Sequence, residues 1–190
     1  MYGAFKDPYC YPGTSILRNL PDLRDRAALQ QYEAMATAQR ADEPLPNGRL
    51  GVAHYRAIHR HLFQDVYDWA GRFGTVSISK NGNTFCYPEN IDREMSKLFE
   101  ALRQREHFKG AEAEAFVLGA TRFLAELNAI HPFREGNGRT QTTFLVVLAI
   151  RAGRTVRLDR LRPRRFLSAM IASFGGDDRP LGSELRLLVS

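Results

Sequence analysis

The sequence has 190 residues, which is long enough for one domain with a sizeable core. Its composition, 44% hydrophobic and 25% charged residues, is typical of a soluble globular protein. Residues 1–8 lack the apolar run of a signal peptide, and the longest apolar stretch, 144–150, is far too short to span a bilayer. Cys10 and Cys86 form neither a disulfide framework nor a metal motif. These features exclude membrane-spanning and disulfide-rich proteins, so we expect a cytoplasmic protein with a single domain over 1–190.

Hydrophobic periodicity and breaker residues predict a mostly helical, all-α chain. A turn-rich entry over 8–21 precedes a series of predicted helices, at 22–41, 52–68, 90–107, 111–130, 140–152 and 163–174, with a short helix at the end of the chain. Asn90 is the expected N-cap of the third helix. Because the residue before a proline avoids helical geometry, Pro132 should end the fourth helix near Ile130.

Segment 75–87 has the character of strands rather than of a helix. Residues 75–79 alternate between polar and apolar types, 80–83 read Lys-Asn-Gly-Asn, and 84–87 form a second extended run. An Asn-Gly pair between two such runs is typical of a β-hairpin. Because an isolated hairpin is only marginally stable, the pattern leaves open both an ordinary surface hairpin and a functional one.

Segment 131–139 concentrates the residues suited to chemistry, and it reads His-Pro-Phe-Arg-Glu-Gly-Asn-Gly-Arg. A neutral His131 can take a proton from an attacking hydroxyl near pH 7. Glu135 offers hard oxygen ligands of the kind that bind Mg²⁺ between phosphates. Its glycines permit close approach of the backbone to a ligand, and a helix N-terminus downstream joins Arg139 in attracting phosphate. Phe133 is expected to anchor the loop in the core.

Other ligand-binding motifs fit this segment poorly. A catalytic zinc site is disfavoured because His-Glu-x-x-His is absent and only one histidine is near Glu135. No Gly-Lys pair exists for a phosphate-binding P-loop, and Gln141 stands where a dinucleotide-binding fingerprint needs glycine or alanine. Three histidines share the predicted helix 52–68 without acidic or cysteine partners at ligand spacing, and we interpret them as packing or surface residues: His54, His59 and His61.

The segment matches H-x-F-x-[D/E]-G-N-G-R, the signature of the Fic family, so the chain resembles Fic proteins. Tyr-Cys-Tyr-Pro-Gly at 9–13 and Trp-Ala-Gly at 69–71 are weaker similarities to the same family. The resemblance covers roughly the whole chain and implies the Fic fold, a helical bundle with a core at about 50–175 and a short β-hairpin flap beside the active-site loop 131–139. It also implies an enzyme that transfers AMP from ATP to a Ser, Thr or Tyr hydroxyl of a target protein.

The resemblance also implies roles for individual residues. His131 is then the general base, and Glu135 holds Mg²⁺. Four residues of the loop form the nucleotide-binding site: Gly136, Asn137, Gly138 and Arg139. Gly136 shapes the loop, and the other three bind the phosphates. The hairpin 75–87 docks the target by strand pairing, and the known targets of bacterial toxin-type relatives include DNA gyrase and topoisomerase IV.

The chain departs from the family at one position. Fic motifs often continue Arg-x-x-Arg, where the second arginine grips the γ-phosphate, and Thr142 stands there in this sequence. Threonine cannot replace a charged fork, although Arg134 is a candidate to compensate. Thr142 therefore leaves two alternatives beside an AMP transferase: a low-activity nucleotide-binding Fic module, or a Fic transferase that uses another nucleotide.

The final expectation concerns partners. Many Fic proteins are inhibited by a helix with the pattern [S/T]-x-x-x-E-[G/N], but the only glutamates followed by Asn or Gly, Glu89 and Glu135, have Phe85 and His131 four residues before them. We therefore expect a separate small antitoxin that carries this helix, and the net charge of +6 favours an acidic partner. The arginine-rich segment 151–165 lacks interleaved aromatic residues, so no direct contact with nucleic acid is expected.

Overall fold

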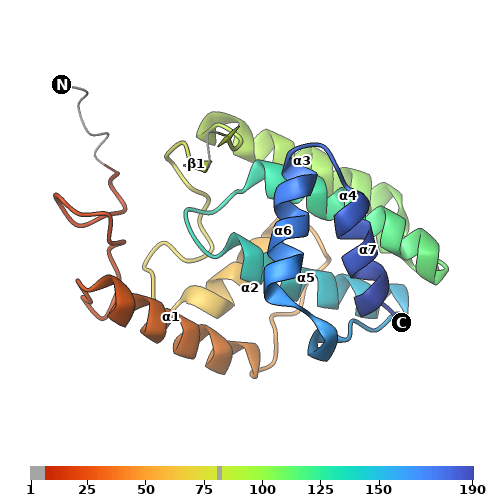
Figure 1. The fold of residues 1–190 in the computed structure, drawn as a ribbon, viewed down its shortest axis with the longest axis horizontal. Coiled ribbons are helices and arrows are strands. Elements are labelled where there is room, and N and C mark those ends of the chain that lie inside the picture. Colours follow the sequence, from red (N-terminus) through yellow and green to blue (C-terminus); the bar gives the residue numbers. More distant parts are fainter. Residues whose placement is uncertain (1–6, 81–82) are drawn as a thin grey trace.

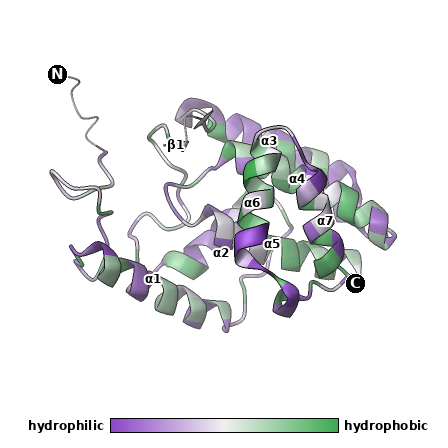
Figure 2. Cartoon of the chain, in the orientation of Figure 1, coloured by the Kyte–Doolittle hydropathy of each residue, from purple (hydrophilic) through white to green (hydrophobic). Residues whose placement is uncertain are grey.

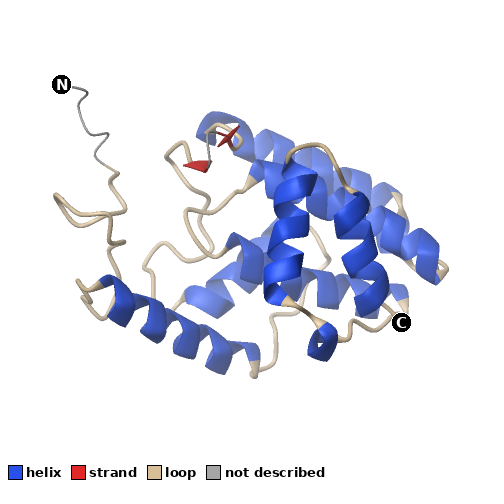
Figure 3. Ribbon diagram, viewed as in Figure 1, coloured by secondary structure: helices blue, strands red, loops and turns tan. Residues whose placement is uncertain are grey.

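The computed structural model describes residues 7–80 and 83–190, and almost all of its regular structure is helical (Figure 3). In chain order the elements are α1 (Arg26–Ala41), α2 (Val52–Phe63), β1 (Ser79–Lys80), β2 (Asn83–Thr84), α3 (Pro88–Gln104), a 3₁₀ turn (Glu106–Phe108), α4 (Ala113–Ile130), α5 (Asn137–Ala152), a second 3₁₀ turn (Leu158–Arg160), α6 (Pro163–Phe174) and α7 (Arg179–Leu188). The predicted helical class is confirmed. Among the described residues, none of the helices combines the length and apolar character that a bilayer crossing requires.

The core is built around α4 and α5, which follow each other in the chain and pack together (Figure 1). α2 packs against α5, α1 covers α2, α3 lies against α4, and the neighbouring helices α6 and α7 both contact α4. In Figure 2 the inner helix α5 is largely hydrophobic, whereas the outer helix α1 alternates between polar and apolar turns, as expected for a helix with one buried face. The space between the helices is filled by large side chains with almost no solvent exposure, including Tyr55, Phe116, Phe133, Phe144, Leu124, Leu127, Leu145 and Leu148.

Most predicted helices are present with shifted ends. The first begins at Arg26 rather than at residue 22, because Asp25 is its N-cap and accepts a hydrogen bond of 2.8 Å from the N–H of Ala28. The helix predicted over 52–68 ends at Phe63. Asn90 is not the N-cap of α3, since that helix begins at Pro88, whose fixed φ suits the first helical position.

The loop that joins α4 to α5 has unusual backbone at both of its ends. α4 ends at Ile130, as Pro132 predicts, and His131 closes it in the left-handed conformation at φ 50° and ψ 58°. α5 begins at Asn137, three residues before the predicted start, because Gly136 is a left-handed N-cap at φ 83°. Gly138 and Arg139 therefore lie in the first helical turn rather than in the loop.

The hairpin region contains a much shorter pairing than the sequence predicts. β1 and β2 are antiparallel with Ser79 opposite Thr84, and the residues on either side of them in 75–78 and 85–87 are not strands. The predicted Asn-Gly turn at 81–82 lies outside the described residues. Just beyond the paired residues, Phe85 N–H donates to the carbonyl of Ile78 at 3.0 Å. Two further backbone bonds connect this segment to its neighbours, from Gly74 N–H to the carbonyl of Pro132 in the motif loop at 2.8 Å and from Cys86 N–H to the carbonyl of Ala129 in the last turn of α4 at 3.2 Å.

Candidate active site

A cavity of about 800 Å³ opens in front of the first turn of α5. His131, Glu135 and Gly138 form part of its lining, with the hairpin arm contributing Ile78 and Phe85. α1 forms another wall, and the side formed by α6 and the segment before it is apolar and includes Leu161, Phe166, Leu167 and Met170. A concave site with one charged end and one apolar side suits a ligand that carries both phosphate and a planar ring.

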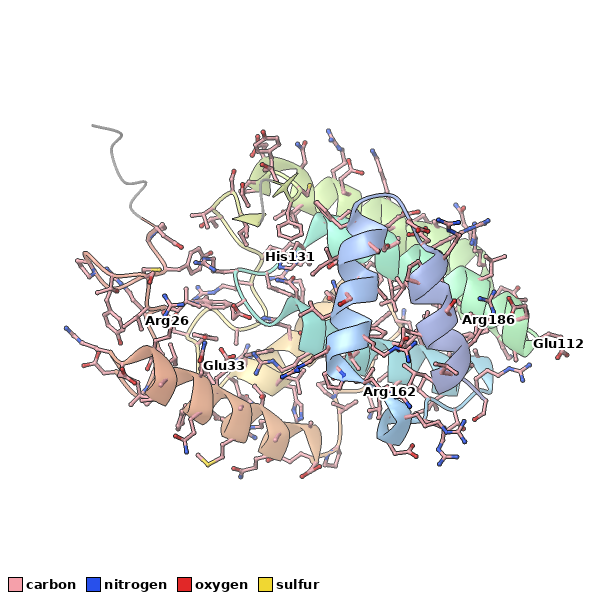
Figure 4. All side chains as sticks on the ribbon, in the orientation of Figure 1. Arg26, Glu33, Glu112, His131, Arg162 and Arg186 are labelled. Carbon is pink, nitrogen blue, oxygen red and sulfur yellow. The ribbon has the colours of Figure 1, made fainter. Side chains whose placement is uncertain are left out.

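His131 lies where the hairpin arm meets the loop (Figure 4). Its imidazole stacks on the ring of Phe85, with centroids 3.9 Å apart and planes inclined by 16°. Its Nδ1 atom is buried, and the residue lines the cavity. Phe85 is in turn packed edge-on against Phe174 of α6, and the ring of the predicted base is thus held from two elements.

The motif loop is held together by its own residues. The side chain of Asn137 is buried, its Oδ1 accepts from the N–H of Phe133 at 3.0 Å, and its Nδ2 donates to the Phe133 carbonyl at 2.7 Å. The Asn137 amide is therefore bonded to the loop backbone, and the expected contact of this residue with phosphate stays a prediction. Phe133 has no exposed surface, which confirms its anchoring role.

A buried histidine of α2 binds the backbone of the motif loop. His59 Nδ1 accepts the N–H of Gly71 at 2.8 Å, and Nε2 donates to the carbonyl of Glu135 at 3.0 Å. Burial lowers the pKa of His59 to about 4, so the ring is neutral near pH 7. His59 is a packing residue, as predicted, and the Trp-Ala-Gly segment has a physical reason here, since Gly71 fixes the tautomer of His59.

Glu135 and the start of α5 form the polar end of the cavity. One carboxylate oxygen of Glu135 accepts the N–H of Gly136 at 2.9 Å, while the side chain still lines the cavity. The N–H groups of the first helical turn have no carbonyl partner within the helix, and the dipole of α5 is positive at this end. Gly138 lies in this turn with open space beside it, because a Cβ added there would meet no atom within 4 Å.

Arg139 is fixed by residues of α1 and α2. Its Nη1 donates to the hydroxyl of Thr37 at 3.0 Å, its Nη2 forms an ion pair with Glu33, and its guanidinium lies 4.7 Å above the centre of the Phe63 ring. Figure 4 shows Glu33 rising from α1 on the side that faces the other helices. About 39% of the Arg139 side chain remains exposed, and it lines the cavity.

The second cation that the Fic signature often carries is replaced by an uncharged group. Thr142 is half-buried on the cavity wall, and its hydroxyl donates to the carbonyl of Gly138 at 3.0 Å. Arg134, the candidate to compensate, donates to Asp7 at 2.7 and 2.9 Å. Burial raises the pKa of Asp7, but the hydrogen bonds from Arg134 and from the N–H of Tyr9 outweigh it and leave this pKa below its usual value. Arg134 is therefore already matched by a carboxylate.

The sequence analysis missed several residues that shape this site. Glu33 and Thr37 are separated from Arg139 by 106 and 102 positions, so no local pattern points to them. For Phe85 the sequence predicted only a place in a strand and not its contact with His131. His59 could have been found from the Trp-Ala-Gly similarity, but its bonding to that segment depends on the tertiary fold.

Comparison with known proteins decides the family. A model of the Fic/DOC family matches residues 49–149. The chain belongs to the Fic/DOC family. It is 52% identical over 189 residues to a Sinorhizobium fredii protein named "Probable protein adenylyltransferase y4lH", a match that covers 99% of this chain and 98% of that protein.

Two further similarities lie within Bartonella. This Fic chain is 34% identical over 188 residues to the protein adenylyltransferase VbhT of Bartonella schoenbuchensis, covering 97% of the chain and 39% of VbhT. Its structure resembles the crystal structure of BepC from Bartonella tribocorum, a translocated effector with bound AMPPNP, at a TM-score of 0.86 and 26% identity over 96% of each chain. The chain is accordingly a protein adenylyltransferase, a nucleotidyltransferase with a helical Fic fold and a nucleotide substrate.

The two glycines of the motif predict different effects of the same substitution. Gly136→Ala should destabilise the protein by at least about 1 kcal/mol, because φ is 83° there and the new Cβ would lie 2.3 Å from a Phe63 ring atom. Gly138→Ala is the matched control, with no loss of stability but weaker nucleotide binding, since its methyl group would project beside the helix N-terminus that lines the cavity. Thermal unfolding and ATP calorimetry measure the two effects. Equal melting temperatures for both variants would contradict this account of Gly136.

Proposed function

We propose that this Fic protein transfers AMP from ATP to a hydroxyl side chain of a target protein, with His131 as general base. The observation that supports this most directly is the position of His131 at the edge of a cavity whose floor is the N-terminus of α5. A helix N-terminus favours phosphate, and the apolar wall from Leu161 to Met170 suits the nucleoside. Mass spectrometry of a bacterial lysate treated with the protein, ATP and Mg²⁺ reports the added group and its acceptor.

The reaction follows from the placement of these groups. The target hydroxyl oxygen forms a bond to the α-phosphorus, the bond from that phosphorus to pyrophosphate breaks, and His131 takes the hydroxyl proton. The N–H groups at the start of α5, together with Arg139, stabilise charge on the phosphate oxygens. Gly138 keeps the backbone accessible to the ligand. The site contributes positioning and charge stabilisation rather than a covalent intermediate.

Glu135 is suited to hold Mg²⁺ in this arrangement. Among the described residues no group of three or more His, Cys, Asp or Glu side chains is arranged to bind a metal ion by itself. Mg²⁺ commonly takes one or two carboxylates with substrate phosphates and water, and Glu135 lines the cavity with one oxygen bonded to Gly136 N–H. When bound, the ion would neutralise charge on the phosphates.

We also propose that the segment around β1 and β2 docks the target. Ile78, Ser79 and Phe85 line the same cavity as His131. Backbone bonds from Gly74 to the motif loop and from Cys86 to the last turn of α4 hold this segment beside His131, so an extended target segment paired along it would lie beside the base. Topoisomerases such as DNA gyrase and topoisomerase IV are the first targets to test, by the family resemblance.

The replacement of the second motif arginine by Thr142 supports a second candidate, a nucleotide-binding Fic protein of low activity. In this case ATP would bind through the α5 N-terminus and Arg139 alone, with the γ-phosphate less firmly held. Both candidates use the same cavity, and the rate of transfer separates them.

Removal of the base is the first test. His131→Ala should reduce transfer by roughly 100- to 10,000-fold, as is typical when a general base is removed. ATP affinity and melting temperature should change little, because His131 lies at the edge of the cavity on the ring of Phe85 and is proposed to act on the proton rather than on the phosphates. Transfer is measured by incorporation of labelled AMP and affinity by calorimetry. Full transfer by this variant would rule out the mechanism.

Restoring the missing cation is the second test. Thr142→Arg should tighten ATP binding, because a charge-assisted contact contributes roughly 1.5–3 kcal/mol. The position is half-buried on the cavity wall, one helical turn from Gly138, so the longer side chain has access to the phosphates. Calorimetry with ATP and with AMP separates the effect on the terminal phosphates from that on the nucleoside. Unchanged affinity for ATP would show that the γ-phosphate is held elsewhere.

The third test addresses a regulatory partner. We propose that a small acidic antitoxin with the inhibitory helix binds this chain, since no such helix pattern occurs in its own sequence and its net charge is +6. Coexpression with the small neighbouring reading frame should yield a copurifying complex and relieve toxicity of the Thr142→Arg form. A harmless Thr142→Arg form that copurifies with nothing would contradict the toxin–antitoxin role.

A further inference from the structure

The N-terminal helix α1 belongs to the active-site cavity although it lies outside residues 49–149, the part matched by the Fic/DOC family model. Its inner face contributes Ala34, Thr37, Ala38 and Ala41 to the wall opposite the hairpin. The small side chains leave room in the cavity, and Thr37 and Glu33 of this helix both contact Arg139. α1 thus supplies polar groups that bind a residue of the site, in addition to forming one of its walls.

Arg139 is held from its inner edge. Thr37 and Glu33, one turn apart on α1, each accept from a different terminal nitrogen of the guanidinium. The ring of Phe63 supports its flat face at 4.7 Å. Two of the five N–H groups of an arginine are used in this way, while 39% of the side chain remains exposed and the residue lines the cavity.

Glu33 is itself fixed by the scaffold. Only 12% of its side chain is exposed. One carboxylate oxygen receives Arg139, and the other receives the hydroxyl of Tyr67, a residue that has 2% exposure and whose phenol pKa is raised by burial and by the nearby Glu33 charge. Both oxygens therefore have donors, and the pair presents its arginine rather than its carboxylate to the cavity.

We propose that Glu33 is a positioning residue of the nucleotide site, which acts through Arg139 and makes α1 part of the ATP-binding machinery. The inference rests on the proposed role of Arg139 at the phosphates. An arginine side chain has many rotamers, and a fixed fork loses less entropy for each hydrogen bond that it forms with phosphate. Without Glu33 the guanidinium would lose its strongest inner contact, and its outer edge would no longer be aimed at the ligand.

The opposite role for Glu33 is competition with phosphate for Arg139. A competitor must move away when the ligand binds, but the Glu33 side chain is only 12% exposed and is bonded to Tyr67 on a neighbouring segment. Breaking these bonds would leave a buried carboxylate without its donors, which is costly. The contacts therefore favour positioning, and the two roles predict opposite changes in ATP affinity.

The test is Glu33→Gln, which keeps the size of the side chain and removes its charge. ATP affinity should fall roughly 10-fold, because misplacing a binding group by about 1 Å can cost up to 100-fold. Asp65→Asn is the matched control: it breaks the ion pair with Arg40, which also fixes α1 but does not line the cavity, and it should leave ATP affinity unchanged. Tyr67→Phe keeps the Glu33 charge but removes one of its donors, and a smaller loss is expected.

A double-mutant cycle shows whether Glu33 acts through Arg139. Arg139→Gln alone should weaken ATP binding, and adding Glu33→Gln to it should have no further effect. Thermal unfolding of each variant verifies that the protein is folded at the temperature of the binding measurement. Unchanged or tighter ATP binding by Glu33→Gln would overturn the inference, and so would full additivity in the cycle.

Transfer of AMP is measured separately on the unsubstituted protein. Absence of transfer there contradicts the proposed function, whereas unchanged ATP affinity in Glu33→Gln with intact transfer contradicts only the role of Glu33. The two failures are thus distinguishable.

Discussion

The arrangement of the site depends on a buried, neutral histidine. His59 accepts from the backbone of one segment and donates to the carbonyl of Glu135, so a single imidazole joins two loops that are far apart in sequence. Its ring lies between the rings of Phe63 and Phe133, at centroid distances of 4.7 and 3.7 Å. A protonated ring could not accept at Nδ1. Folding lowers the pKa of His59 from 6.5 to about 4. The contribution of the neutral ring to the free energy of unfolding is therefore fully present above about pH 6.5 and is lost as the pH falls toward 4.

Further supports of the motif come from parts of the chain that precede residues 49–149, the range matched by the family model. Asp7 binds Arg134, and the hydroxyl of Tyr9 contacts Thr75 at the base of the hairpin arm. α1 binds Arg139 through Glu33. Each cation of the motif therefore has a carboxylate partner that precedes the core in sequence, so the geometry of the motif depends on segments that a nine-residue signature does not contain.

The sequence was sufficient to predict the features that are local. A nine-residue motif identifies the candidate base and phosphate loop, periodicity identifies the helices, and Pro132 predicts the end of α4 at Ile130. The early start of α5 was missed because it depends on Gly136 adopting a left-handed conformation against the ring of Phe63. A Thr140 start is reasonable on local propensity alone, yet tertiary packing decides the boundary.

Backbone hydrogen bonding accounts for the other differences. The orientation of the Asn137 amide toward the Phe133 backbone, rather than toward a ligand, is set by the tight turn of the loop. The strands predicted over 75–79 and 84–87 are reduced to two residues each, and the backbone at Gly74 and Cys86 bonds to the motif loop and to the end of α4 rather than across the pair. A pattern of alternating residues does not indicate which segment the backbone N–H and C=O groups will bond to.

The attachment of the two hairpin arms to the motif loop and to the end of α4 has a consequence for which residue of a target would be modified. A segment that paired with this edge would advance by about 3.3 Å for each residue and turn alternate side chains to opposite faces. His131 is fixed relative to that edge through Pro132 and Ala129. The register of pairing would therefore select the modified residue by its position along the bound segment. A shift of one residue would turn its hydroxyl away from the base.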